Sequence, residues 1–177
     1  MKQLLRDKRI ILFPIAAVAL IAVGFGIAQL SRPSTNPIPS DVMSGLKFTP
    51  LIVPQDNSRI RASHYALGPT DNGTRPLSFE LAIDDQNVSV TETQLPAQFN
   101  EIPEYKERFI DTFITGSESI GTGSGTIYFG RPAKANDYSH VGIMFDRGLL
   151  TIFSLKSGTL TQDEWRRIGD ALVAAKE

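Results

Sequence analysis

The sequence contains no cysteine and only two histidines among its 177 residues. The absence of cysteine excludes disulfide bonds, thiol nucleophiles and cysteine-ligated metals, so a hydrophobic core must hold the fold together. The two histidines, His64 and His140, lie far apart and lack the paired spacing of a metal-binding helix. No Gly-x-Ser-x-Gly nucleophile elbow occurs either. We therefore expect no catalytic, cofactor-binding or metal-ligating residues, and no enzyme activity.

Clusters of basic residues are missing from everything that follows residue 9. Lys2, Arg6, Lys8 and Arg9 take four of the 18 bases and Asp7 takes one of the 19 acids, which leaves 14 bases against 18 acids in the rest of the chain. Nucleic-acid binding depends on clustered lysine and arginine that neutralise phosphates. A mildly acidic chain without such a cluster argues against a nucleic-acid partner.

One long apolar run, Ile10–Leu30, contains no charged residue across 21 positions. About 20 apolar residues in a helix cross a hydrocarbon core roughly 30 Å thick, so the run predicts a single transmembrane helix. The four bases within residues 1–9 predict a cytoplasmic N-terminus and an extracytoplasmic C-terminal region. The alternative is a cleaved signal peptide, for which Gly26 and Ala28 could form the cleavage site.

The chain after the anchor divides into a linker and one domain. Residues 31–45 are rich in serine and proline, and Pro33, Pro37 and Pro39 favour an extended, semi-rigid stalk. Residues 46–177 are enough for one ordinary domain and too few for two.

Alternating apolar residues predict two β-hairpins in this domain. Residues 77–83 and 88–93 form the first, and residues 140–145 and 149–155 form the second, in which a short Gly-containing turn joins the strands. The density of apolar residues in the second hairpin indicates the centre of a sheet. Between the hairpins, aromatic residues spaced by four within residues 103–113 predict a short helix, although its end could continue as a strand.

A capping box marks the start of the C-terminal helix. Thr161 is expected to cap the helix, and Glu164 three residues later returns the hydrogen bond to the backbone. Trp165, Ile168 and Leu172 form an apolar stripe that should pack across the sheet as part of the core.

Several other motifs have plain structural interpretations. The glycine-rich stretch 116–125 lacks the Gly-Lys-Ser/Thr ending of a phosphate-binding loop, so we expect a flexible loop or hairpin tip. Asp84 with Asp85, or Asp111 with Glu118, could form a carboxylate pair for glycan hydrolysis or calcium binding, but a solvated turn is the simpler explanation for the first pair. Tyr128, like Trp165, is expected in the core or on the sheet surface.

The C-terminal pattern GTIYFGRP followed by HVGIMFDRGLLTIFSLKSGTLTQDEWRRIGDALV resembles a family of bacterial extracytoplasmic domains of unknown function. These domains are tethered by one spanning helix and also occur on anti-sigma-like and sporulation-associated proteins. The resemblance implies an α+β domain with a curved antiparallel sheet and a terminal helix, without enzyme chemistry. This chain departs from the anti-sigma members because nine cytoplasmic residues cannot form a sigma-binding domain.

Three hypotheses for function follow. The first is a single-pass envelope protein whose outer domain binds a protein partner. The second is a module that binds a lipid, peptide or glycan on its sheet face, which requires an apolar pocket of roughly 300 Å³ or more. The third is a divergent envelope hydrolase, which requires an acid, base or nucleophile cluster that the sequence does not reveal.

Overall fold

The computed structural model describes residues 37–70, 73–134 and 137–175. In these three ranges no helix has the length and apolar character needed to span a membrane. The predicted anchor at residues 10–30, and the flanking bases Lys2, Arg6, Lys8 and Arg9, lie outside the described residues.

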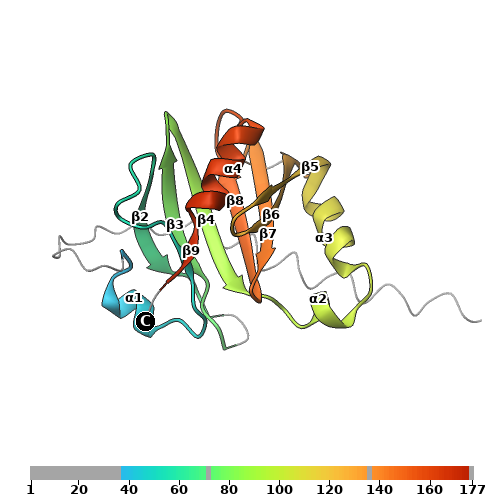
Figure 1. Cartoon of the computed structure of the whole chain (residues 1–177). Coiled ribbons are helices and arrows are strands. Elements are labelled where there is room, and N and C mark those ends of the chain that lie inside the picture. The colour runs from blue at the N-terminus through green and yellow to red at the C-terminus, as the bar shows by residue number, and fades with distance from the viewer. Residues whose placement is uncertain (1–36, 71–72, 135–136, 176–177) are drawn as a thin grey trace, which may run out of the picture. The chain divides into compact units, whose positions relative to one another are not determined.

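The described chain forms a seven-stranded antiparallel sheet with helices against it (Figure 1). The strand order across the sheet is β2-β3-β4-β8-β7-β6-β5. The strands are β2 (Ile60–Leu67), β3 (Leu77–Ile83), β4 (Gln86–Gln94), β5 (Ile114–Thr122), β6 (Gly125–Pro132), β7 (His140–Asp146) and β8 (Leu149–Leu155). The predicted α+β class is confirmed, with a curved antiparallel sheet and a C-terminal helix.

Two meanders meet in the middle of this sheet. β2, β3 and β4 follow one another, and β5 to β8 follow one another, so β4 and β8 join the halves by antiparallel pairing. The connection from β4 to β5 carries the chain to the far edge through α2 (Gln98–Glu101) and α3 (Tyr105–Phe113). Both expected hairpins are present, as β3–β4 and β7–β8.

The main core lies between one face of the sheet and α4 (Gln162–Ala171), which crosses the front of the sheet in Figure 1. Trp165 is 0% exposed and stacks on Phe129 with ring centroids 5.4 Å apart. Gly142 of β7 gives the indole its space, because a Cβ there would lie 2.8 Å from two ring carbons of Trp165.

A second apolar cluster lies on the opposite face of β7 and β8, because successive side chains of a strand alternate between faces. Its buried members are Ile110, Ile114, Val141, Ile143 and Leu150. Helix α3 supplies the first of these. Strand β7 is thus buried on both faces, in agreement with its unbroken apolar content.

Residues before position 46 also pack into the core. Within the expected linker, α1 (Ser40–Ser44) forms after Pro39, and Ile38 and Val42 are buried in the main core. Proline is tolerated at the start of a helix, so Pro39 is compatible with a helix that begins at Ser40. Further on, β1 (Leu51–Ile52) pairs with β9 (Val173–Ala174) beyond α4.

The glycine-rich stretch contains the expected hairpin tip, but most of it is strand. Most of residues 116–125 belong to β5, which forms one edge of the sheet, and the turn to β6 lies at Gly123 and Ser124. Backbone pairing with β6 holds this strand, whose side chains from Thr115 to Ser119 are exposed. The strand has only two buried apolar side chains, Ile114 and Ile120, and their wide spacing leaves no alternating pattern in the sequence.

Candidate functional site

The connection through α2 and α3 carries a group of half-buried aromatic residues. Tyr105, Phe109 and Phe113 follow the spacing that predicted this helix, and the last two stack with centroids 4.9 Å apart. Helix α3 ends at Phe113 and β5 begins at the next residue, so the expected helix is followed directly by a strand. The amphipathic stripe faces the second apolar cluster.

Phe99 of α2 is the centre of this aromatic group. Its ring contacts Tyr105 at a centroid distance of 4.8 Å, Phe109 at 5.1 Å and Phe145 of β7 at 5.2 Å. Lys106 places its Nζ 4.8 Å from the Phe145 ring centroid and 5.3 Å from that of Tyr128. Such edge-to-face and cation–π contacts fix α2 and α3 against the sheet. Tyr128 is therefore a half-buried aromatic of the sheet surface, as expected.

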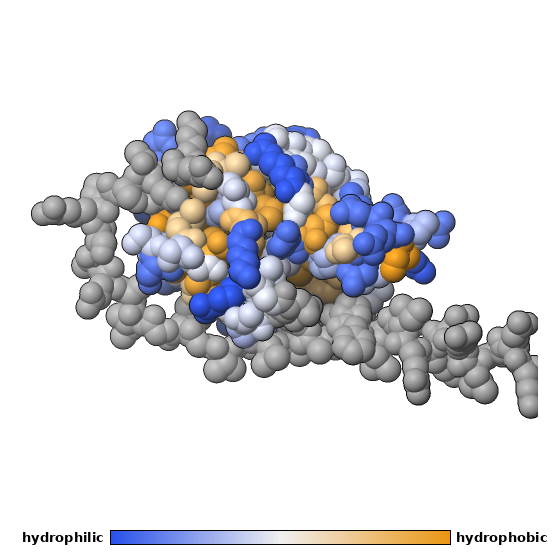
Figure 2. All heavy atoms as spheres, turned by 90° about the horizontal axis from the view of Figure 1, so that it is seen from below, coloured by the Kyte–Doolittle hydropathy of each residue, from blue (hydrophilic) through white to orange (hydrophobic). Residues whose placement is uncertain are grey.

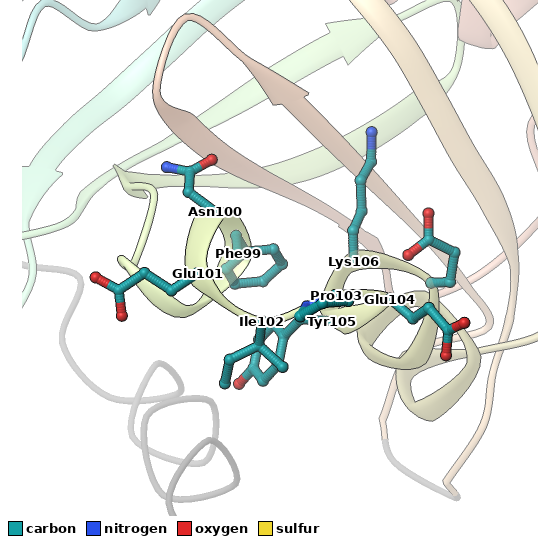
Figure 3. A pocket seen from close by; sticks show the side chains of 9 residues that line it. Phe99, Asn100, Glu101, Ile102, Pro103, Glu104, Tyr105 and Lys106 are labelled. Carbon is teal, nitrogen blue, oxygen red and sulfur yellow. The ribbon is translucent and has the colours of Figure 1, made fainter.

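A hollow of about 350 Å³ lies along the α2–α3 connection (Figure 3). Residues 99–107 supply its whole lining, which includes the apolar Ile102 and Tyr105 and the acidic Glu101 and Glu104. Figure 3 shows the Ile102 and Tyr105 side chains pointing the same way, with Glu101 on one side and Glu104 on the other. In Figure 2, on the side of the molecule where Figure 1 places α2 and α3, hydrophilic residues surround small hydrophobic patches. The hollow therefore combines an apolar centre with a charged rim.

The turn between the two helices has an unusual backbone. Glu104 has a φ of 59°, in the left-handed region that residues other than glycine rarely adopt. The turn is closed by a hydrogen bond from the Tyr105 amide to the Ile102 carbonyl at 3.2 Å, and Arg108 donates from its guanidinium to the Pro103 carbonyl at 3.1 Å. These bonds hold Ile102 and Tyr105 in place.

A buried glutamate is the second unusual feature of the domain. Glu92 of β4 is 0% exposed, and its Oε2 accepts a 3.0 Å hydrogen bond from the amide of Leu51 in β1. Burial raises the pKa of Glu92 to about 8, against a smaller lowering by the Leu51 amide. The same environment raises the pKa of Tyr65, first through burial and then through the nearby Glu92. Thr151 lies opposite Glu92 in the pairing of β4 with β8.

Three polar atoms around this carboxyl group are buried without a hydrogen-bond partner among the described residues: Glu92 Oε1, Tyr65 Oη and Thr151 Oγ1. A carboxyl group in such surroundings stays protonated at neutral pH, because the apolar core cannot solvate its charge. Its position beneath β1, within the main core, closes it off from solvent. Glu92 is therefore a structural acid without access to a substrate.

Sequence reasoning did not single out Glu92, although a signal was present. Val88 and Val90 precede it at intervals of two, so the strand's alternation places Glu92 on the same inward face.

A serine, a histidine and a carboxylate meet at one exposed place on β2 and β3. Ser63 Oγ lies 3.3 Å and Glu80 Oε2 lies 3.1 Å from the same ring nitrogen, Nδ1 of His64. A hydrolytic triad needs the acid at one nitrogen of the ring and the nucleophile at the other. The arrangement therefore lacks the geometry of a triad.

The other histidine belongs to the core. His140 accepts a 3.2 Å hydrogen bond at Nδ1 from the Leu160 amide, and its ring contacts Trp165 edge-to-face at 5.6 Å. Burial is the main cause that lowers the pKa of His140, and it favours the neutral ring that can accept this bond. In the part of the chain that the structure describes, no three histidine, aspartate or glutamate residues gather as metal ligands.

The helix cap and core residues named from the sequence lie at the start of α4, along its inner face and, for Leu172, directly after its last residue. Thr161 Oγ1 accepts from the Glu164 amide at 3.3 Å, and Glu164 Oε2 accepts from the Thr161 amide at 2.6 Å. Trp165, Ile168 and Leu172 are all buried.

One acid of each candidate carboxylate pair contacts a side chain of α4. Asp84 binds Arg167 of α4 at 2.6 Å, and Asp85 is exposed in the same turn. Glu118 accepts from Gln162 at 2.8 Å, whereas Asp111 is exposed on α3.

No protein-family model, no curated protein and no solved structure matches this chain. The function must therefore be argued from the surface that the fold presents.

Proposed function

We propose that this is a single-pass membrane protein whose extracytoplasmic domain binds another protein, without catalysing a reaction. The observation that carries the proposal is the aromatic surface at α2 and α3, where Phe99, Tyr105 and Phe109 are half-buried around the hollow. Protein interfaces are enriched in aromatic anchors that sit in hollows and are surrounded by polar residues.

The membrane tether rests on the sequence. The 21-residue apolar run Ile10–Leu30 is long enough to span a bilayer, and the four bases before it favour a cytoplasmic N-terminus. A reporter enzyme that is active only outside the cytoplasm, fused after Glu177, should be active. Activity of this reporter only when it is fused at the N-terminus would refute the proposed orientation.

The form of the hollow favours a docking surface over a small-molecule site. A single stretch of nine residues lines it, and five of these are charged or amide residues: Asn100, Glu101, Glu104, Lys106 and Glu107. Ligand pockets enclose their ligand with mostly apolar side chains from several elements. An open hollow in one stretch of chain suits a protruding side chain of a partner.

Site-specific photo-crosslinking tests this proposal. A photoreactive amino acid placed at Ile102 or Tyr105 of the full-length protein, in its native membrane, should form adducts with a defined protein. The same group at Asn87, which is exposed on β4, is the matched control and should form none. Adducts that are equal at both places, or absent at Ile102 and Tyr105, would refute the proposed surface.

A further inference from the structure

We infer that the partner presents a basic polypeptide segment, in which an apolar side chain enters the hollow between α2 and α3 and lysine or arginine residues flank it. This inference rests on the proposed function and names the chemistry of the partner. It follows from the arrangement of apolar and acidic residues around the hollow and from the excess of acidic over basic residues in the α2–α3 segment.

The apolar centre is formed before any partner binds. Phe99 is held from three sides by Tyr105, Phe109 and Phe145 at centroid distances between 4.8 and 5.2 Å. The hydrogen bond from Tyr105 to the Ile102 carbonyl fixes the turn above it. A surface that is already rigid loses little conformational entropy on binding, which favours affinity.

The rim of the hollow is acidic on both sides of this centre. Glu101, Glu104 and Glu107 line it and are exposed, and Asp111 extends the row of exposed acids along α3. Figure 3 places Glu101 and Glu104 on opposite sides of Ile102 and Tyr105. A ligand that covers the apolar pair therefore meets a carboxylate at each end.

The same segment also carries two cations, Lys106 and Arg108, which contact neutral groups. Lys106 lies over the rings of Tyr128 and Phe145, and Arg108 donates to the Pro103 carbonyl. In Figure 3 the Lys106 side chain points away from Ile102 and Tyr105. Residues 99–111 carry four acids against these two bases, which leaves a net charge of −2. Complementary charge on a partner increases both specificity and association rate.

The sign of this charge distinguishes a basic polypeptide from the other surfaces near a tethered domain. Acidic side chains are repelled by anionic lipid headgroups and by nucleic-acid phosphates. A lysine or arginine segment gains from the same carboxylates, and its apolar residue gains from the burial of Ile102 and Tyr105. The row of alternating apolar and acidic groups therefore matches a basic peptide.

The test is a selection of random 12-residue peptides, displayed on phage, against the full-length protein in lipid nanodiscs. We expect enriched peptides to carry an aromatic or large aliphatic residue with lysine or arginine on both sides. Replacement of both rim acids, Glu101→Gln with Glu104→Gln, should weaken a selected synthetic peptide roughly threefold to tenfold, since each exposed ion pair contributes little. The salt dependence of binding should decrease in the same variant.

A matched control removes two exposed acids elsewhere, by Asp56→Asn with Asp85→Asn. This variant should bind the selected peptide like the unmodified protein. Enrichment of neutral or acidic peptides, no enrichment, or equal weakening by both variants would overturn the inference. Adducts at Ile102 and Tyr105 together with acidic peptides would refute the basic partner alone, whereas absence of adducts would refute the docking surface.

Discussion

Replacement of Gly142 by alanine should destabilise the domain through one contact. A Cβ at this position would lie 2.8 Å from Cζ3 and Cη2 of Trp165 and 3.4 Å from Cδ2 of Phe153. The indole cannot move aside easily, because Phe129, His140 and Phe153 surround it at centroid distances of 5.4 to 5.8 Å. Either β7 or α4 must therefore move to make room for the added methyl group.

The magnitude follows from two opposing effects. Overpacking a core typically costs about 1 to 3 kcal/mol, whereas replacing glycine by alanine stabilises by about 0.4 to 1 kcal/mol through the unfolded state. We therefore expect a net loss of about 1 to 2 kcal/mol in the free energy of unfolding. Urea unfolding of the purified protein, followed by circular dichroism, measures this loss.

Two further variants isolate the cause. Gly121→Ala is the matched control, because a Cβ at Gly121 meets nothing within 4 Å, and its stability should remain within about 0.5 kcal/mol of the unmodified protein. In a Trp165→Phe background the clashing ring carbons are absent, so Gly142→Ala should cost less there than in the unmodified protein. Equal losses in the two backgrounds, or equal stability of the Gly142 and Gly121 variants, would refute the steric explanation.

Three other changes test separate features of the fold. Folding raises the pKa of Glu92 from 4.5 to about 8, so between these pH values the folded state holds a proton that the unfolded state has lost. The free energy of unfolding should therefore fall on the order of 4 kcal/mol from pH 5 to pH 9. In urea titrations, Glu92→Gln should remove this fall, whereas the exposed control Glu107→Gln should keep it. Thr161→Ala should lower the free energy of unfolding by about 1 kcal/mol, and with it the melting temperature, because it removes the capping box of α4. An unchanged melting temperature would show that packing alone fixes the helix start. Arg147→Asn should stabilise the domain by about 0.5 kcal/mol in thermal unfolding. Arg147 and Gly148 both have positive φ in the β7–β8 turn, and Asn-Gly is the preferred sequence for such a turn. A loss of stability would mean that the Arg147–Asp146 ion pair at 3.2 Å contributes more than the backbone strain costs.

The parts of the fold that could be predicted are those whose signals are local. The alternation in residues 77–83 and 149–155 and the Thr161–Glu164 capping box each depend on neighbours within a few positions. Edge strand β5 buries only Ile114 and Ile120, six positions apart, so its pairing with β6 left no such pattern. The packing of Ile38 into the core was hidden for a similar reason, since the neighbouring prolines favour an extended stalk as readily as a helix start.

The candidate site was predictable only in part. The stripe of Tyr105, Phe109 and Phe113 indicated an amphipathic helix, and α3 is that helix. The contacts of Phe99 with Phe145 join α2 to β7 across 46 positions of sequence, and no spacing rule reveals such a pair. The tertiary fold therefore determines which aromatic residues come together, whereas the local sequence determines the helix that carries most of them.

Strand β7 connects the core to the candidate surface, and this decides which substitutions can test binding. Gly142 faces Trp165 beneath α4, whereas Ile143 and Phe145 face the second cluster, in which Phe145 supports Phe99. Truncation of Phe99 or Phe145 would therefore alter both packing and the hollow, and a loss of binding would have two explanations. Glu101 and Glu104 are exposed, so their replacement by glutamine changes the charge of the rim while the aromatic support stays in place. Binding and stability can be separated at the rim, and it is there that a partner's contribution can be measured.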